Sequence, residues 1–269
     1  MKPVIPLALM ALFLVESAMA DEKQHATGYT DTPVIPGSKW KVHDDDRPRP
    51  PVVAPGGEVT WPAPADAIVL FDGKNLDEWT RKGGGDPGWK LVDGTMEVVP
   101  KSGDLLTKRE FGDVQLHLEW HPHDPPESNS QHRSNSGVFF FDRYEVQILD
   151  CYENKTYGDG MAGAIYGQYP PLVNAANPPS KWQTYDIVFI APRFKDDGSL
   201  ESPAKVTVFL NGILVQHATE LLGNTPHKRV GSYKAHGPKG PIRLQDHRDQ
   251  PIRFRNIWIR ELDFSKQRE

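Results

Sequence analysis

Short segments in which apolar and polar residues alternate recur along most of the chain, and no stretch shows the period of a long amphipathic helix. Residues 114–121 place apolar side chains at even positions and polar ones at odd positions, and residues 144–148 alternate likewise. A period of two is that of a β-strand with one apolar face. Further strands are expected over 68–71, 89–92, 95–99, 182–190, 205–210, 213–216 and 252–262. About ten short strands separated by Gly, Pro and Asn turns predict an all-β fold, an antiparallel sandwich or jelly roll.

Turn residues predict how some of these strands are joined. Asp93-Gly94 separates two short strand-like segments, and Asn211-Gly212 separates two more. Both dipeptides favour tight hairpin turns, because their residues tolerate positive φ angles. In the last segment the apolar phase shifts between Phe254 and Ile257, which predicts a β-bulge there.

The chain is predicted to consist of three parts. Residues 1–20 contain Lys2, an apolar run over 4–15 and the sequence Ala18-Met19-Ala20. These features are typical of a cleaved signal peptide, so an exported protein, periplasmic or secreted, is expected. The apolar run is too short for a membrane span of roughly 20 residues. Residues 66–264 suit one domain, because all-β sandwiches can reach about 200–250 residues.

Residues 21–65 are predicted to form a flexible, proline-rich tail. Six prolines fall between Arg47 and Pro64. Proline lacks a backbone donor and favours extended, solvated chain. We therefore expect little regular structure in this segment, and we expect that deletion of residues 21–60 leaves folding and activity nearly intact.

Charge and cysteine content narrow the range of partners. The net charge of −5 argues against nucleic acid as a partner. Cys151 is the only cysteine, so neither an intrachain disulfide nor a Cys-based zinc site can form. Glu119, Glu145, Asp150 and His247 offer donors for a divalent metal, but no local ligand motif supports one, so no cofactor is expected. No feature of the sequence points to an oligomeric state.

Several strand-like segments carry polar residues that are costly to bury. These segments are 134–141, 144–150, 163–167 and 240–247, which include Glu, Gln, Asp and His. An unpaired buried polar group costs roughly 1–3 kcal/mol, so such residues tend to line a wet groove or a site. The pattern indicates a sheet with one face given over to binding. The long polar loops 121–134 and 151–181 also exceed the usual loop length of about 4–6 residues and are often functional.

A set of motifs in order along residues 66–264 resembles a known family. They include Leu70-Phe71-Asp72-Gly73, Asn135-Ser136-Gly137-Val138, the stretch 144–150, Trp182-Gln183-Thr184-Tyr185-Asp186 and Leu244-Gln245-Asp246-His247. The chain resembles the 3-keto-disaccharide hydrolase domain family (DUF1080). That resemblance implies a concanavalin A-like jelly-roll sandwich of two antiparallel sheets and a carbohydrate substrate, a 3-keto sugar or related glycan. Arg248 stands where many relatives have glycine.

The chemistry implied by the resemblance begins at the ketone. A 3-keto group acidifies the hydrogen on C2, so a base can form an enolate, the C1–O bond can break by elimination, and water can add afterwards. The catalytic candidates are Glu145, His247 and Asp150, with His247 or Glu145 as the base. The candidates for substrate binding are Glu119, Asn135, Arg143, Gln147, Tyr166, Gln245, Asp246, Arg253 and Trp258.

Geometry qualifies some of these assignments. Glu145 and Gln147 lie two apart on one strand and share a face, whereas Asp150 points the other way by simple alternation. A cross-strand ion pair is the structural alternative for Glu145, and a turn-stabilising role is the alternative for His247. At the level of the whole protein, two rivals stand beside the 3-keto-glycoside enzyme. One is a lectin-like carbohydrate-binding domain, and the other is an ordinary glycoside hydrolase with paired carboxylates.

Overall fold

The computed structural model describes residues 27–247 and 250–264, so the predicted signal peptide and Arg248 lie outside the described residues. The described strands are β1 (Ile68–Phe71), β2 (Trp79–Arg81), β3 (Lys90–Val92), β4 (Thr95–Glu97), β5 (Leu105–Thr107), β6 (Val114–His121), β7 (Ser136–Phe140), β8 (Tyr144–Ile148), β9 (Gln183–Ile190), β10 (Arg193–Phe194), β11 (Leu200–Ser202), β12 (Lys205–Leu210), β13 (Ile213–Glu220), β14 (Ile242–Leu244) and β15 (Arg253–Glu261). Two short 3-10 helices, Ser130–His132 and Gly158–Gly160, lie in the long loops. In this described part, no helix is long and apolar enough to cross a membrane.

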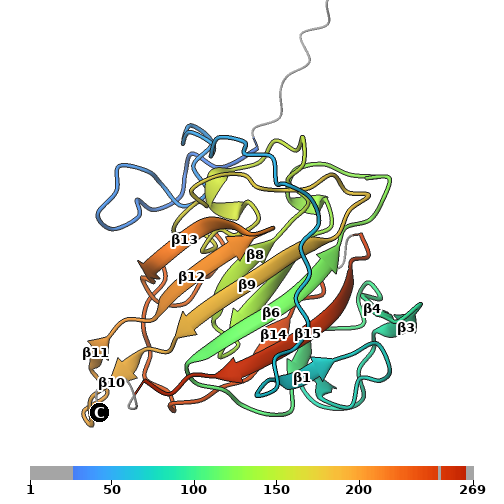
Figure 1. Ribbon diagram of the computed structural model, residues 1–269. Coiled ribbons are helices and arrows are strands. Elements are labelled where there is room, and N and C mark those ends of the chain that lie inside the picture. Colours follow the sequence, from blue (N-terminus) through green and yellow to red (C-terminus); the bar gives the residue numbers. More distant parts are fainter. Residues whose placement is uncertain (1–26, 248–249, 265–269) are drawn as a thin grey trace, which may run out of the picture.

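The strands form two main antiparallel sheets. The larger has the order β13-β12-β9-β6-β15-β4-β3, with β1 also paired to β15, and the smaller has the order β2-β5-β14-β7-β8. Figure 1 shows the larger sheet in front, with β8 and β14 of the smaller sheet behind it. A separate hairpin joins β10 and β11. The predicted sandwich of two antiparallel sheets is confirmed.

The core lies between the two sheets. Phe140 of β7 stacks on Phe189 of β9 with ring centroids 4.3 Å apart, which joins the smaller sheet to the larger one. Trp120 of β6 packs near Tyr185 of β9, and both are fully buried. Burial of one such side chain contributes about 1.5–3 kcal/mol. Since side chains alternate along a strand, the residues between these inward ones point to the outer faces.

The local turn chemistry follows the sequence. Asp93 and Gly94 have φ angles of 49° and 73° and join β3 to β4, while Asn211 and Gly212 have φ angles of 52° and 78° and join β12 to β13. The predicted bulge is confirmed, because the register of β15 against β6 shifts between Arg255 and Trp258. The extra residue bends the strand where β1 begins to pair with it.

Residues 27–65, here called the strap, are not a tail without contacts. The described strap contains no helix or strand, as its prolines predict, and has only isolated bridges such as Tyr29 with Asp44. However, Ile35 and Val42 are only 2% and 0% exposed. The strap therefore has buried apolar residues of its own, although the core between the two sheets contains none of its residues. Proline composition reports missing backbone donors, but says nothing of whether the apolar residues between prolines find a partner.

The second half of the strap crosses the outer face of the larger sheet (Figure 1). The Thr60 hydroxyl donates to the carboxylate of Glu119 on β6, and the Thr184 hydroxyl on β9 donates to the carbonyl of Val59. The carbonyl of Trp61 accepts hydrogen bonds from Asn256 Nδ2 at 2.9 Å and Trp258 Nε1 at 3.1 Å on β15. The polar face of β6 is thus covered by the protein's own chain and does not form an open groove.

Candidate active site

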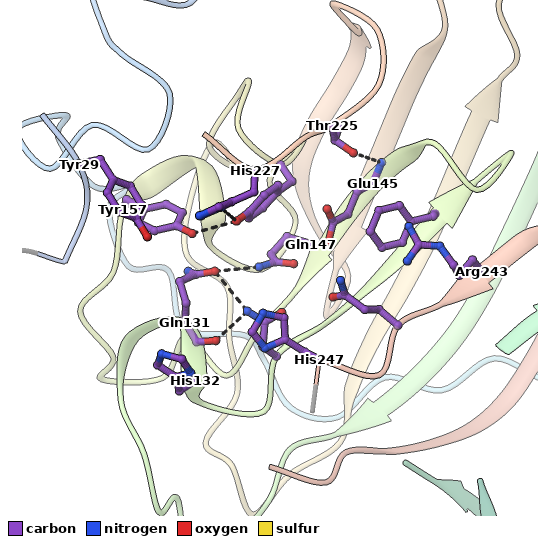
Figure 2. A pocket seen from close by; sticks show the side chains of 14 residues that line it. Tyr29, Gln131, His132, Glu145, Gln147, Tyr157, Thr225, His227, Arg243 and His247 are labelled. Atoms are coloured by element: carbon purple, nitrogen blue, oxygen red, sulfur yellow. Dashed lines mark hydrogen bonds between the residues drawn. The ribbon is translucent and has the colours of Figure 1, made fainter. Parts of the chain in front are cut away.

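A cavity of about 420 Å³ opens on the outer face of the smaller sheet, on the side away from the core (Figure 2). This volume lies within the range of roughly 300–1,000 Å³ typical of small-ligand sites. Its lining residues are Tyr29, Gln131, His132, Asn135, Phe139, Glu145, Gln147, Tyr157, Tyr166, Thr225, His227, Arg243, Gln245 and His247. They come from β7, β8, β14, the long loops and the strap.

Strand register brings the central residues together. Glu145 of β8 lies opposite Phe139 of β7, and Phe139 lies opposite Arg243 of β14. Gln147 lies opposite Gly137, whose carbonyl accepts the backbone N–H of Gln245 at 3.2 Å. Because these positions alternate with the inward apolar residues, their side chains share the outer face.

Glu145 is the one carboxylic acid among the described residues that line this cavity, and its pKa is strongly raised. Its side chain is only 4% exposed, and desolvation raises the pKa of its carboxyl to about 8. The positive charge of Arg243 acts in the opposite direction, and the negative charge of Asp104 adds to the rise. A carboxyl with such a pKa can exchange a proton near neutral pH, which is the property required of a general acid or base.

Gly137 makes room for this carboxyl. A Cβ atom at position 137 would lie 2.3 Å from Glu145 Oε1, far inside van der Waals contact. The absence of a side chain on β7 therefore lets the Glu145 carboxyl lie against the sheet instead of standing out into the cavity.

We expect Gly137→Ala to displace the Glu145 carboxyl and to lower turnover by about 10²-fold, because misplacement of a reacting group by about 1 Å costs that much. The fold should survive, since the nearest atom is the free end of a side chain. The matched control is Gly56→Ala, where an added Cβ meets nothing within 4 Å. Steady-state kinetics and thermal unfolding of both variants check the prediction, and unchanged turnover of Gly137→Ala would show that the carboxyl position is unimportant.

An amide network forms one wall. Gln147 Nε2 donates to Gln131 Oε1 at 3.1 Å, and Asn135 Nδ2 donates to the Gln131 carbonyl at 2.7 Å. Gln131 in turn donates to the carbonyl of Gly160 at 3.0 Å. Within the described structure, Gln147 Oε1 and Gln245 Oε1 are buried and accept no hydrogen bond. Buried polar atoms are normally satisfied, so these two oxygens are suited to accept from ligand hydroxyls.

Aromatic residues form the opposite wall. The hydroxyls of Tyr157 and Tyr166 are 3.0 Å apart, and the Tyr166 hydroxyl is 2.9 Å from His227 Nδ1. Desolvation, followed by the electrostatic interaction with His43, lowers the pKa of His227 to about 4, so this imidazole is neutral at pH 7. Desolvation and the neighbouring Glu145 raise the pKa of Tyr166 well above its usual range, so its hydroxyl keeps its proton.

Arg243 supplies the cationic group. Its guanidinium lies 3.3 Å from the ring centroid of Phe139 and forms ion pairs with Asp104 at 2.6 Å and with Asp142. These contacts hold the side chain in one orientation beneath the cavity. Arg143 and Arg253, the cations expected from the sequence, lie elsewhere: Arg143 is exposed, and Arg253 pairs with Glu97 at 2.6 Å.

The structure brings one group of the predicted site residues into this cavity: Asn135, Glu145, Gln147, Tyr166, Gln245 and His247. Gln245 and His247 are far from the other four in sequence and meet them because β8 and the segment after β14 flank β7. The His247 ring lies near that of His132, with centroids 6.4 Å apart. Two imidazoles therefore stand at the mouth on the same side as Gln131 (Figure 2).

Other predicted site residues have structural roles. Asp150 accepts a 2.7 Å hydrogen bond from Arg133 Nε and is buried outside the cavity, as alternation along β8 implies. Asp246 accepts the backbone N–H of Gly103 at 2.9 Å. Neither carboxylate lines the cavity, so the structure does not bring these two predicted residues together with the others.

Glu119 and Trp258 lie under the strap on the larger sheet. Glu119 forms a 2.6 Å ion pair with Arg255. Burial alone would raise the pKa of Glu119, but hydrogen bonds from His117, Asn256 and Thr60 hold it at about 2. Trp258 stacks on His117 with ring centroids 4.9 Å apart. Both residues fix the strap to the sheet and do not contact the cavity, because they project from the opposite layer of the sandwich.

The donors that the sequence offered for a metal are dispersed. Glu145 and His247 line the cavity, whereas Glu119 lies under the strap and Asp150 is paired with Arg133. Among the described residues, no group of three or more His, Cys, Asp or Glu side chains is arranged to hold a metal ion.

Sequence reasoning missed Tyr29, Gln131, His132, Phe139, Tyr157, Thr225, His227 and Arg243. Two of them could have been found from the sequence, since Phe139 and Arg243 alternate with the inward residues of their strands and so face outward. The others stand on loops or on the strap. Thr225, for example, places its hydroxyl 3.1 Å from the backbone nitrogen of Glu145 across the top of β8.

Comparison with known proteins agrees with the geometry. The model of the 3-keto-alpha-glucoside-1,2-lyase-like domain family matches residues 66–260. A solved structure named "putative glycosyl hydrolase", from Parabacteroides distasonis ATCC 8503, is 48% identical, with a TM-score of 0.74 over 80% of this chain and 93% of that one. Another structure with the same name and organism is 26% identical, with a TM-score of 0.53 over 73% and 99% of the two chains. No curated protein matches the chain.

The chain therefore belongs to the 3-keto-alpha-glucoside-1,2-lyase-like domain family. The matched range begins at residue 66, so the strap lies outside it. The resemblance inferred from the sequence motifs is confirmed, and the central cavity residues on β7, β8 and β14 all lie within the matched range.

Proposed function

We propose that this protein is an exported carbohydrate-active enzyme that cleaves the glycosidic bond of a 3-keto-α-glucoside by elimination. Membership of the family and the likeness to the named glycosyl hydrolases support action on a carbohydrate. The observation that carries the mechanism is the buried Glu145, the sole carboxylate among the described residues that line the cavity. An ordinary glycosidase needs two carboxylates flanking the bond, whereas proton removal from C2 needs one base.

The steps follow from the groups in the cavity. Glu145 in its ionised form takes the proton from C2, and the electron pair of that C–H bond delocalises onto the C3 oxygen as an enolate. The charge of Arg243 and the Tyr166 hydroxyl stabilise the developing negative charge. The enolate then forms a C1–C2 double bond as the C1–O bond breaks, and His247 protonates the leaving oxygen. Addition of water across the double bond completes the net hydrolysis.

The lining of the cavity combines polar groups with aromatic rings, which suits a sugar. The unpartnered oxygens of Gln147 and Gln245 accept from sugar hydroxyls, and the rings of Tyr166 and Phe139 give apolar surface for the sugar C–H groups. A lectin also has such a surface, but it has no need of a carboxyl whose pKa stands at about 8.

Methyl 3-keto-α-glucoside should be cleaved, and methyl α-glucoside with its 3-hydroxyl intact should not. The ketone delocalises the C2 carbanion, and a hydroxyl cannot. In deuterated water the 3-keto sugar product should carry deuterium at C2, as read by NMR or mass spectrometry. Equal cleavage of both substrates without deuterium uptake would indicate a conventional glycosidase, and binding without cleavage would indicate a lectin.

A further inference from the structure

A second cavity of about 230 Å³ adjoins the first. The two share Tyr29, Gln131, His132 and Tyr157, and the second adds Thr27, Gly28 and Ser130. The added residues directly precede Tyr29 and Gln131 in the chain, so they extend the site beside the wall that Tyr29 and Tyr157 form. Figure 2 shows these two tyrosines together at one side of the first cavity. The far wall of the second cavity comes from residues outside the range that the family model matches.

This wall is held in place by a buried anchor. The backbone N–H of Tyr29 donates to the carbonyl of His43 at 2.8 Å. His43 binds Asp159 twice, through its backbone N–H at 2.9 Å and through Nδ1 at 3.2 Å, and both side chains are fully buried. The His43 ring also packs on that of Tyr157 at 4.3 Å. Tyr29 is thus positioned by contacts to the same loop that carries the aromatic wall.

Gly28 packs so closely against this anchor that, as at Gly137, there is no room for a side chain. A Cβ at position 28 would lie 2.5 Å from the carbonyl oxygen of His43 and 2.9 Å from the backbone of Asp45. Neighbouring Thr27 donates to Asp45 Oδ1 at 2.7 Å. The start of the strap is therefore a tightly packed turn held by specific contacts.

We propose that this turn, residues 27–29, together with Ser130 completes a second sugar subsite that holds the leaving sugar of a 3-keto-disaccharide. The inference rests on the proposed function, in which the first cavity holds the 3-keto ring. The second cavity has hydroxyl groups from Thr27 and Ser130 and aromatic rings from Tyr29 and Tyr157, and no carboxylate among its described lining. Hydroxyls with ring surface are the groups that recognise a neutral sugar.

The test compares two substrates of the full chain, methyl 3-keto-α-glucoside and a 3-keto-disaccharide whose leaving group is glucose. Tyr29→Ala and Gly28→Ala should each reduce the preference for the disaccharide, expressed as the ratio of the two kcat/KM values, by about tenfold, equivalent to about 1.4 kcal/mol. Gly56→Ala, on the same strap with no atom within 4 Å of an added Cβ, should leave the ratio unchanged.

An equal loss on both substrates, or no loss on either, would overturn the subsite while the proposed function stands. If the wild-type protein cleaves neither 3-keto substrate, the proposed function fails. In that case calorimetric binding of the unoxidised disaccharide and of methyl α-glucoside still tests the subsite. A disaccharide preference that depends on Tyr29 would support it, and a preference that is absent or independent of Tyr29 would refute it. Thermal unfolding of each variant identifies any that fails to fold. If one of the two variants does not fold, the other alone is sufficient to test the subsite.

Discussion

Replacing Glu145 with glutamine is expected to lower turnover of methyl 3-keto-α-glucoside by about 10²–10⁴-fold, the usual contribution of a general base. Glutamine keeps the size and the hydrogen-bonding shape of the side chain but cannot accept the C2 proton. The matched control is Glu97→Gln, which removes the charge of a buried carboxylate on the larger sheet that contacts neither the cavity nor the strap. Retained turnover in Glu145→Gln would assign the base to another residue, with His247 the first to examine.

The pH profile of the wild-type enzyme gives a second readout of the same group. A base whose pKa is about 8 is ionised in about one molecule in ten at pH 7, so kcat/KM should rise about tenfold per pH unit below about 8 for as long as His247, the proposed acid, keeps its proton. The neutral His227, with its pKa lowered to about 4, adds no step near neutrality. A profile that falls in wild type and that keeps the same falling limb in His247→Ala would instead make the protonated carboxyl the active form.

The stability of Glu145→Gln separates lost chemistry from lost folding. The Glu145 pKa is raised from 4.5 in the unfolded chain to about 8 in the folded protein, so the ionised form is disfavoured by folding. That cost is absent below pH 4.5, grows as the pH rises, and is complete above about 8. The variant should therefore gain stability relative to the wild type between pH 5 and pH 9 in thermal unfolding. A variant that is less stable at pH 9 than the wild type would contradict this pKa assignment.

Deletion of residues 27–61 is expected to lower the free energy of unfolding by several kcal/mol, since it removes the buried contacts of His43 with Asp159 and the hydrogen bond of Thr60 to Glu119. For a domain of this size the melting temperature should fall by roughly 10 °C or more. Activity should fall as well, because Tyr29 lines the cavity. This outcome reverses the expectation, drawn from the prolines, that the segment is dispensable.

Paired substitutions test the same point without removing the strap. Ile35→Ala with Val42→Ala should destabilise the protein by several kcal/mol, because each change leaves a buried void. Val34→Ala with Val52→Ala, at sites 54% and 77% exposed on the same segment, should cost less than about 1 kcal/mol in total. Calorimetric melting curves compare the two pairs. Equal stability of the two double variants would show that the strap does not contribute to the stability of the fold.

The fold was readable from the sequence because its determinants are local. The alternation over 114–121 gave β6, and Asp93-Gly94 and Asn211-Gly212 marked hairpin turns that the structure contains. The phase shift near Asn256 likewise located the bulge, since an inserted residue reverses which side chains face the core. The order of strands in the two sheets carried no such local mark and depends on long-range pairing.

The site was readable only in part, for two physical reasons. Alternation placed Glu145 and Gln147 on one outer face, but it also made the polar face of β6 look like a groove. Alternation distinguishes inward from outward residues and does not reveal what covers the outward ones, so Glu119 was assigned to a site although Thr60 lies on it. In addition, Tyr29 and His227 reach the cavity from irregular segments, where sequence spacing sets no direction.

The course of the strap also constrains the order in which the protein folds. The carbonyls of Val59 and Trp61 accept hydrogen bonds from β9 and β15, which lie more than a hundred residues further along the chain. The site that binds Trp61 does not exist until β15 has paired with β6, so this part of the strap can dock only after strands that follow it in the chain have assembled. The opening turn of the strap bears on the cavity through Tyr29, and the site is therefore finished only when the earliest part of the described chain returns to the assembled sandwich.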